Sequence, residues 1–577
     1  MKKLIYSLLC CLFFLSANAQ WKWHNPMEAG FPVIQNQGFT NEIGKTYTRL
    51  PNRVKGSVDK GLWGLSQHSA GLAIHFYSNA PEIKVRYAVT GKNFGMHHMP
   101  ATGVSGVDLY QINCDGKWAF CFGSYSFKDT IVYSYNNIKK DKYHNYGYEY
   151  RLYLPLYNGV KWLEIGTPED AKFEFIPLLD EKPIVVYGTS ITQGACASRP
   201  AMAWTTILQR SVDYPLINLG FSGNGRLETP ILDLINEINA RLYILDCIPN
   251  LTGKWVDQIE DRVYKAVKQI RAKHDTPILL LEHAGYSNGG SDTIMYERYI
   301  AANKCSRRAY EKLIAENVPG LYYVTREELN LSPDSRVDYV HASDLGMQQQ
   351  ATAVEKKVRE ILHIPTGNYS TTIPVTQRRE PGRYEWLKRH RFMSQTAKER
   401  SPKAVIIGNS ITHYWGDNNE EWKNGEQTWN QKMRPAGFHN LGCGWDRIEN
   451  VLWRIYHDEL DGYKTDKVVL MIGTNNFGYN TNYEIVEGLR FLLSAIRQRQ
   501  PEAKITVLGI YPRRKMEQRV KDINLQIRQM AELEGFHFAD PGLNLLQPDG
   551  KIDESLFTDG LHPNEKGYQK VVDEILK

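Results

Sequence analysis

The strongest constraint on this 577-residue chain is that one pattern of apolar runs, amphipathic stretches and polar residues occurs in it twice. The first copy places Ser190 just after a buried-type apolar run, and His341 follows 151 residues later (341 − 190). The second copy places Ser410 in the same way, and His562 follows 152 residues later (562 − 410). A chain of this length needs more than one core, and the repeat predicts that two of the cores are copies of one domain.

Both copies alternate short apolar runs with amphipathic stretches. In the first copy, apolar runs such as 184–187 and 242–245 are separated by helical patterns, the last of them at 345–362. In the second copy, the corresponding runs include 404–407 and 468–472. Apolar strands that alternate with helices are typical of a parallel sheet covered on both faces. We therefore predict two α/β/α domains.

The residues before the first copy have a different pattern of apolar and turn-forming residues. Short runs rich in β-formers, at 73–77, 83–87 and 148–154, are separated by Gly, Pro and Asn turns, and no helical period competes with them. This pattern predicts a β-sandwich of the jelly-roll kind. The predicted organisation is a leader at 1–19, a β domain at 20–178, a first α/β domain at 179–363, a linker at 364–400 and a second α/β domain at 401–577.

The first nineteen residues have the form of a signal peptide. Lys2 and Lys3 precede an apolar run at 4–15, and Ala17-Asn18-Ala19 has the small-x-small form of a cleavage site. No later stretch reaches about 18 apolar residues. We predict an exported chain that begins near Gln20, in the periplasm or the medium, without stable membrane insertion.

Composition excludes some partners and leaves others open. A net charge of +6 is mild for this length, and there is no basic face with interleaved aromatics, so no nucleic-acid partner is expected. No C-x-x-C pair with a matching His pair is present, so no zinc site is expected. We also predict no cofactor. A hairpin disulfide between Cys114 and Cys121 is one option in an oxidising compartment, and proximity of Cys196 to Cys247 is another. Nothing in the composition indicates an oligomeric state.

Each repeated serine has the partners that an acyl-transfer nucleophile needs. A hydroxyl is a weak nucleophile until a base takes its proton, and His341 and His562 are the candidate bases. Asp338 and Asp559 precede these histidines by three residues. One turn can therefore bring each carboxylate onto its imidazole and fix the tautomer. Any one of these residues alone is more often structural, but their repeated order favours catalysis.

Donors for an oxyanion are expected from the loops that follow later strands. In the first copy these are the backbone N–H of Gly223 and the side-chain amide of Asn250. In the second copy they are the backbone N–H of Trp445 and the amide of Asn475. With the N–H of each serine, every copy would supply three donors, and losing one such donor typically costs about 2.7–4 kcal/mol in the barrier.

At these residues the chain resembles the SGNH (GDSL-like) hydrolase superfamily. The first copy and the β domain are similar to exported members whose N-terminal domain has a G-x-D-L-Y motif, here residues 106–110. The second copy resembles the platelet-activating-factor acetylhydrolase alpha-subunit type, through 440–446, 450–454 and 472–476. The resemblance implies a flavodoxin-like α/β/α fold and metal-free serine hydrolysis of small acyl esters. It also suggests substrate-binding roles for Asp108, Tyr110 and Asp446.

Two departures from the family pattern bear on substrate. Trp445 stands where the family usually has glycine, and an indole there would crowd the acyl pocket, so a small acyl group such as acetyl is predicted. In the first copy, residues 246–250 replace the usual G-x-N-D block, and Asn250 is taken as the donor by analogy with related exported members.

The leading hypothesis is an exported carbohydrate O-acyl esterase with two active sites. One alternative is a lipid acyl hydrolase or thioesterase, suggested by the acetylhydrolase likeness. Another is a glycan-binding protein with one silent hydrolase domain. In that case Trp21, Trp23, Trp63 and Trp118 would be stacking platforms, although filling a core is the commoner use of such residues.

Overall fold

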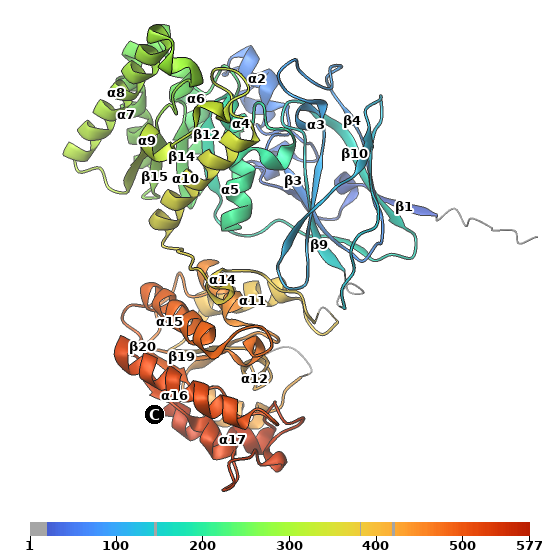
Figure 1. Ribbon diagram of the computed structural model, residues 1–577, viewed down its shortest axis with the longest axis vertical. Coiled ribbons are helices and arrows are strands. Elements are labelled where there is room, and N and C mark those ends of the chain that lie inside the picture. The colour runs from blue at the N-terminus through green and yellow to red at the C-terminus, as the bar shows by residue number, and fades with distance from the viewer. Residues whose placement is uncertain (1–19, 143–146, 381, 418–421) are drawn as a thin grey trace, which may run out of the picture.

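The structure is a computed structural model that describes residues 20–142, 147–380, 382–417 and 422–577. The predicted leader lies outside these residues. Figure 1 shows a β-rich N-terminal part beside a first α/β part, with the second α/β part below them in orange and red.

The N-terminal part consists of two antiparallel sheets. Val85 and Leu163 of one sheet and Phe76 and Leu152 of the other are fully buried in one apolar cluster, so the two sheets share a core. The β-rich prediction is confirmed, and the jelly-roll topology stays a prediction. The first sheet has the order β1 (Trp21–His24), β10 (Val160–Pro168), β4 (Ile83–Val89), β8 (Ile131–Tyr135) and β7 (Ser124–Ser126). The second has the order β11 (Phe173–Phe175), β3 (Ala73–Ser78), β9 (Tyr148–Tyr153), β5 (Asp108–Ile112) and β6 (Trp118–Cys121), with β2 (Ile34–Gln35) beside β3.

The expectation of an N-terminal part without helices is wrong. It contains the short helices α1 (Thr40–Ile43), α2 (Lys60–Ser66) and α3 (Ala101–Val104). Phe39 and Leu62 are buried in the same apolar cluster as Val185 of the first parallel sheet. The segment around α1 and α2 therefore covers one face of the α/β domain instead of continuing the β-sandwich.

The first α/β part is built on a parallel five-stranded sheet. Its order is β13 (Leu216–Gly220), β12 (Ile184–Gly188), β14 (Leu242–Asp246), β15 (Ile278–Leu281) and β16 (Leu321–Val324). Numbered along the chain this is 2-1-3-4-5, the flavodoxin-like order. Successive residues of β12 face opposite layers: Val186 packs with α5 (Trp204–Val212) and α10 (Asp344–Leu362). Val185 packs with the layer formed by α6 (Thr229–Ile235), α7 (Ile259–Arg271) and α8 (Thr293–Ala315).

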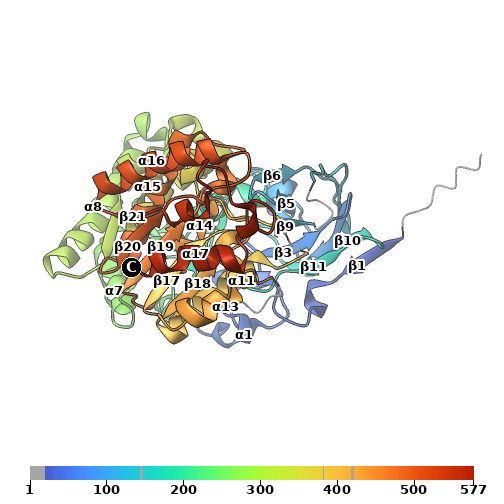
Figure 2. The same cartoon turned by 90° about the horizontal axis from the view of Figure 1, so that it is seen from below.

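The second α/β part repeats this sheet. Its order is β18 (Phe438–Gly442), β17 (Ala404–Gly408), β19 (Lys467–Met471), β20 (Lys504–Leu508) and β21 (His537–Ala539), and every neighbouring pair is parallel. One face is covered by α14 (Ile448–Tyr456), α15 (Asn482–Arg499) and α16 (Glu517–Glu534), and the other by α17 (Glu565–Leu576). Figure 2 shows these helices from below. The predicted duplication of a parallel sheet is confirmed.

The segment predicted as a linker is packed into the second α/β part. It contains α11 (Trp386–Arg400), whose Trp386, Met393 and Ala397 are buried in the core of that part. The two α/β parts also touch directly. Arg241 makes a two-pronged ion pair with Asp458, at 2.8 and 3.0 Å, in a largely buried position.

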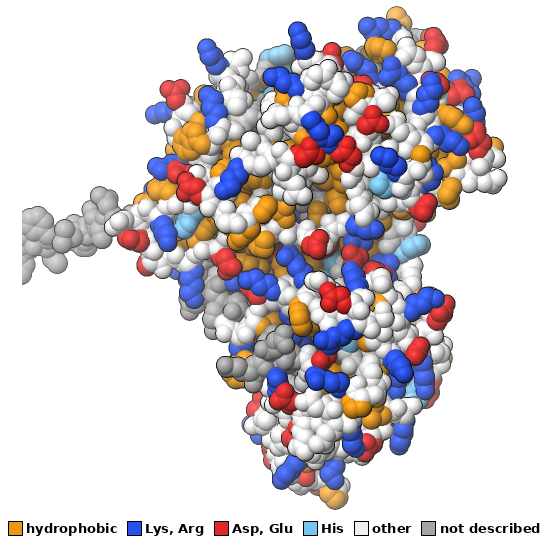
Figure 3. Space-filling model, turned by 180° about the vertical axis from the view of Figure 1, so that it is seen from behind, with side chains coloured by type: hydrophobic (Ala, Val, Ile, Leu, Met, Phe, Trp, Pro, Cys, Tyr) orange, Lys and Arg blue, Asp and Glu red, His pale blue; other side chains and the backbone are white. Residues whose placement is uncertain are grey.

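The surface is mixed in charge. On the face shown in Figure 3, Lys and Arg side chains are interspersed with Asp and Glu side chains. Within the described part of the chain, every helix is too short or too polar to span a bilayer.

Candidate active sites

Each repeated serine begins a short helix at the carboxyl end of its sheet. Ser190 opens α4 (Ser190–Gln193) two residues after β12, and Ser410 opens α12 (Ser410–His413) two residues after β17. The preceding residue caps the helix in both copies: Thr189 Oγ1 accepts from the N–H of Ile191, and Asn409 Oδ1 accepts from the N–H of Ile411. A serine at the first helical position keeps its own N–H free of helical hydrogen bonds.

The structure brings both predicted triads together. Ser190 Oγ lies 2.9 Å from His341 Nε2, and His341 Nδ1 lies 2.7 Å from Asp338 Oδ2. In the second copy, Ser410 Oγ lies 2.8 Å from His562 Nε2, and His562 Nδ1 lies 2.7 Å from Asp559 Oδ2. These are the contacts that let a histidine accept the serine proton while a carboxylate fixes its tautomer.

Both aspartates are held in the ionised form. Partial burial alone would raise the pKa of Asp338, but hydrogen bonds from the N–H and ring of His341 and from the N–H of Val340 outweigh it and lower this pKa. The pKa of Asp559 is lowered by the same combination, with burial again opposing the bonds from His562. A charged carboxylate at this position stabilises the imidazolium that forms when the serine loses its proton.

The predicted oxyanion donors occupy matching positions in the two copies. Gly223 and Trp445 both have left-handed backbones, with φ of 65° and 63°. The amide of Asn250 donates to the carbonyl of Asn224, and the amide of Asn475 donates to the carbonyl of Asp446 at 3.0 Å. An amide nitrogen carries two hydrogens, so each side chain retains one donor after this anchoring bond.

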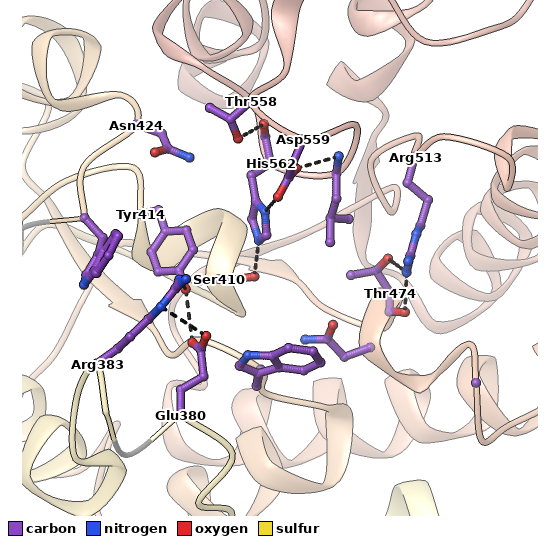
Figure 4. A pocket seen from close by; sticks show the side chains of 15 residues that line it. Glu380, Arg383, Ser410, Tyr414, Asn424, Thr474, Arg513, Thr558, Asp559 and His562 are labelled. Atoms are coloured by element: carbon purple, nitrogen blue, oxygen red, sulfur yellow. Dashed lines mark hydrogen bonds and ion pairs between the residues drawn. The ribbon is translucent and has the colours of Figure 1, made fainter. Parts of the chain in front are cut away.

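The second serine opens into a cavity of about 570 Å³. Two of its lining residues, Glu380 and Arg383, come from the segment before α11, which lies outside both motif copies and was predicted to be a linker. Arg383 lies 4.4 Å from the ring of Trp422 and donates to Tyr414 at 3.3 Å. Figure 4 shows the residues around the triad, among them Glu380, Arg383, Tyr414, Asn424, Thr474, Arg513 and Thr558.

A second cavity, of about 510 Å³, lies against the first active site and is lined largely by the β-rich part. His98, in the loop between β4 and α3, lines it and places its ring 5.8 Å from that of His341. Tyr157 also lines it and donates to the carbonyl of Ser190 at 3.2 Å. Both residues were missed from the sequence, because neither lies near a catalytic motif along the chain.

The three predicted substrate-binding residues do not line either cavity. Asp108 is buried, pairs with Arg199 at 3.0 Å and accepts from the N–H of Ala201, so it fastens the β-rich part to the first α/β part. Tyr110 is buried beside it and accepts from the same arginine. Asp108 Oδ2 and the Tyr110 hydroxyl therefore both contact Arg199, which places these two side chains in the contact between the β-rich part and the first α/β part.

Asp446 is also structural. Its carboxylate is fully buried and accepts from Arg454 at 2.9 Å, from Trp386 at 2.7 Å and from Gln377 at 3.1 Å. Burial raises its pKa to about 6, although Arg454 opposes this. Asp446 therefore anchors the oxyanion loop to α11 and α14 and does not bind substrate.

The disulfide options are not realised. Within the described chain, Cys114 is not joined to Cys121, and Cys196 is not joined to Cys247. The four tryptophans proposed as stacking platforms are each partly buried, and three of them have a cation over the ring. Lys84 lies over Trp21 and Arg86 over Trp23, while Trp63 packs against the first α/β core and Trp118 lies under Arg151.

Comparison with known families matches all three parts of the chain. Residues 21–173 match the model described as the N-terminus of Esterase_SGNH_hydro-type. Residues 181–359 match one model of the GDSL-like lipase/acylhydrolase family, and residues 406–570 match another.

Two relatives show how the similarity is divided along the chain. The human platelet-activating factor acetylhydrolase IB subunit alpha1 is 29% identical over 207 residues, which cover 35% of this chain and 85% of that protein. The crystal structure of a candidate GDSL-like lipase from Bacteroides ovatus is 32% identical, with a TM-score of 0.55. That match covers 60% of this chain and 99% of the other.

Proposed function

Because this chain belongs to the GDSL-like lipase/acylhydrolase family in both of its α/β parts, we propose that it is a serine esterase with two active sites that removes acetyl or other small acyl groups from carbohydrates. The observation that carries the proposal is the pair of Ser–His–Asp relays, with Ser-to-His contacts of 2.9 and 2.8 Å. Family membership indicates ester hydrolysis, and the acyl group and the carbohydrate are the proposed refinements.

The reaction follows from the geometry at each site. In the first site, Ser190 Oγ attacks the ester carbonyl while His341 Nε2 takes its proton, and Asp338 stabilises the imidazolium. The oxyanion accepts from the N–H groups of Ser190 and Gly223 and from the amide of Asn250. His341 then returns the proton to the leaving alkoxide, and a water activated by the same histidine releases the acid. Ser410, His562 and Asp559 perform the same steps in the second site.

The lining of the second cavity favours a carbohydrate ester. Trp422 and Trp445 are each about two-fifths exposed there, and exposed aromatic rings present apolar faces beside polar tips. Glu380, Arg383 and Asn424 lie around them with hydrogen-bonding groups. A cavity that combines apolar ring faces with many polar groups suits a sugar, which has both apolar C–H faces and hydroxyl groups.

A lipid ester is the second candidate. It is favoured by the 29% identity to a platelet-activating factor acetylhydrolase subunit, whose name also points to an acetyl group. Acetyl release from acetylated polysaccharides and from micellar acetyl lipids would separate the two. We expect release from the polysaccharide, and activity confined to the lipid would refute the carbohydrate assignment.

The esterase proposal is tested with p-nitrophenyl acetate and four proteins: wild type, Ser190→Ala, Ser410→Ala and the double variant. We expect a partial loss of rate in each single variant and loss to background in the double variant. Complete loss in one single variant would mean that the other site is silent on this ester. Undiminished activity in the double variant would show that neither serine is the nucleophile.

Export is proposed from the leader pattern of residues 1–19. We expect the protein recovered outside the cytoplasm to begin at Gln20, and N-terminal sequencing would check this. Recovery of an uncleaved chain in the cytoplasm alone would refute it.

A further inference from the structure

Three side chains with metal-binding atoms meet at the first active site. His98 comes from the loop between β4 and α3, Cys196 from the loop after α4, and His341 from the turn before α10. One ring nitrogen of each histidine and the sulfur of Cys196 all lie within 4.8 Å of one another. The three residues come from distant parts of the chain, so C-x-x-C spacing could not reveal them.

The donor set suits a thiophilic divalent cation. Imidazole nitrogen and thiolate sulfur are the ligands that Zn²⁺ prefers, and three protein ligands leave one position for water. His98 Nδ1 is buried and has no hydrogen-bond partner within the described chain, so this ring has a nitrogen to spare. His341 Nδ1 is held by Asp338 at 2.7 Å. A carboxylate behind a histidine is the usual arrangement at zinc sites, because it orients the ring and increases its basicity.

We propose that the first active site binds Zn²⁺, or a similar thiophilic divalent cation, through His98, Cys196 and His341, and that this binding reversibly inhibits the first site alone. On binding, the Cys196 thiol gives its proton to the buffer and becomes a thiolate ligand. Because Asp338 occupies Nδ1, the ring nitrogen of His341 that binds the cation is Nε2. That atom otherwise accepts the proton of Ser190, so the bound cation removes the catalytic base.

The second active site is a natural control within the same chain. Six residues after its nucleophile stands Gly416, where the first copy has Cys196 (416 − 410 and 196 − 190). The ring beside its catalytic histidine is that of Tyr414, 5.3 Å from His562, in place of His98. A glycine and a neutral phenol do not replace a thiolate and an imidazole, so the second site should be insensitive to the cation.

Binding is tested directly with Co²⁺ as a spectroscopic probe of the purified full chain. We expect a thiolate-to-cobalt absorption band that Zn²⁺ abolishes. Ser190→Ala should keep or strengthen this band, since it removes the hydroxyl that competes for Nε2. Cys196→Ser should abolish it, and Cys196→Ala is the second variant if the first folds poorly. Absence of the band from both the wild type and Ser190→Ala would overturn the proposal, whether or not the first site proves to be an esterase.

Inhibition is tested with each site isolated. In Ser410→Ala, where only the first site works, Zn²⁺ should abolish hydrolysis of p-nitrophenyl acetate and a chelator should restore it. Replacing Cys196 by Ser in that background should raise the half-inhibiting zinc concentration at least about 10-fold, because losing even an outer-shell partner of a metal ligand typically lowers metal affinity about 10- to 100-fold. In Ser190→Ala, the second site should be unaffected. Equal inhibition of both sites, or an unchanged zinc response on loss of Cys196, would overturn the proposal.

Discussion

Replacing Trp445 by glycine should open the second active site to longer acyl chains without unfolding the protein. Trp445 has a φ of 63°, where a side chain costs roughly 1–2 kcal/mol. Glycine removes this strain but returns about 0.5–1 kcal/mol of chain entropy to the unfolded state. The strain relieved is at least as large as the entropy cost, and the ring is about two-fifths exposed, so the variant should fold. The matching position in the first copy is already Gly223, with a φ of 65°.

The size of the effect follows from how much chain the emptied space can bury. An octanoyl group has about six more methylenes than acetyl, and each buried methylene contributes about 0.8 kcal/mol. If half of them enter the space left by the indole, the transition state gains about 2.4 kcal/mol. That corresponds to a rise of roughly 50-fold in kcat/KM for octanoate relative to acetate.

The assay uses the Ser190→Ala background, so that only the second site reports. The ratio of kcat/KM for p-nitrophenyl octanoate to that for the acetate is compared between Trp445 and Trp445→Gly. Trp445→Phe is the control, because it keeps a bulky ring and should keep the acetate preference. An unchanged ratio in the glycine variant, or an octanoate preference with Trp445 in place, would refute the argument that the indole limits the acyl group.

Two further perturbations probe the surroundings of the sites. Burial raises the pKa of Asp246 to about 7, so the folded protein favours the protonated carboxyl. The stability that this protonated carboxyl contributes is complete below about pH 4 and is lost as pH rises toward 7. Asp246→Asn should therefore be more stable than wild type at about pH 8, by on the order of 4 kcal/mol, and should lose this advantage at about pH 4. Thermal unfolding at both pH values would measure the difference in stability, and a difference that does not depend on pH would contradict the prediction. Arg383→Ala removes the cation over Trp422, a contact worth about 0.5–1 kcal/mol, and should raise KM about 2- to 5-fold at the second site only. Kinetics on acetylated glycan in the Ser190→Ala and Ser410→Ala backgrounds would measure KM at each site separately. An equal change at both sites would contradict the prediction.

The parts of this protein that the sequence predicts are those fixed by local periodicity or by repetition. The strands of both parallel sheets are continuous apolar runs, such as Ile184–Gly188 and Ala404–Gly408, and a run buried on both faces has few other uses. The triads could be predicted because the spacing from serine to histidine differs by only one residue between the copies. A repeated spacing between polar residues has no explanation in core packing.

What the sequence does not predict depends on contacts between distant segments. Asp446 looks like a site residue because it adjoins the oxyanion loop, yet its carboxylate faces Arg454 in the interior. The direction of a single side chain is set by a helix that packs from elsewhere in the chain, here α11 with Trp386. Motif position alone therefore cannot separate a ligand of the substrate from a buried ion pair.

The two sites differ most in what the rest of the chain adds to them. At the first site, the β-rich part supplies His98 beside the catalytic histidine. At the second, the segment before α11 supplies Glu380 and Arg383. The relays are nearly identical in their distances, so the chemistry of bond cleavage should be common to both. Differences in substrate and in response to cations must then arise from these residues, which other segments of the chain add to each site. Exchanging these surrounding residues, rather than the triads, should therefore exchange the specificities of the two sites.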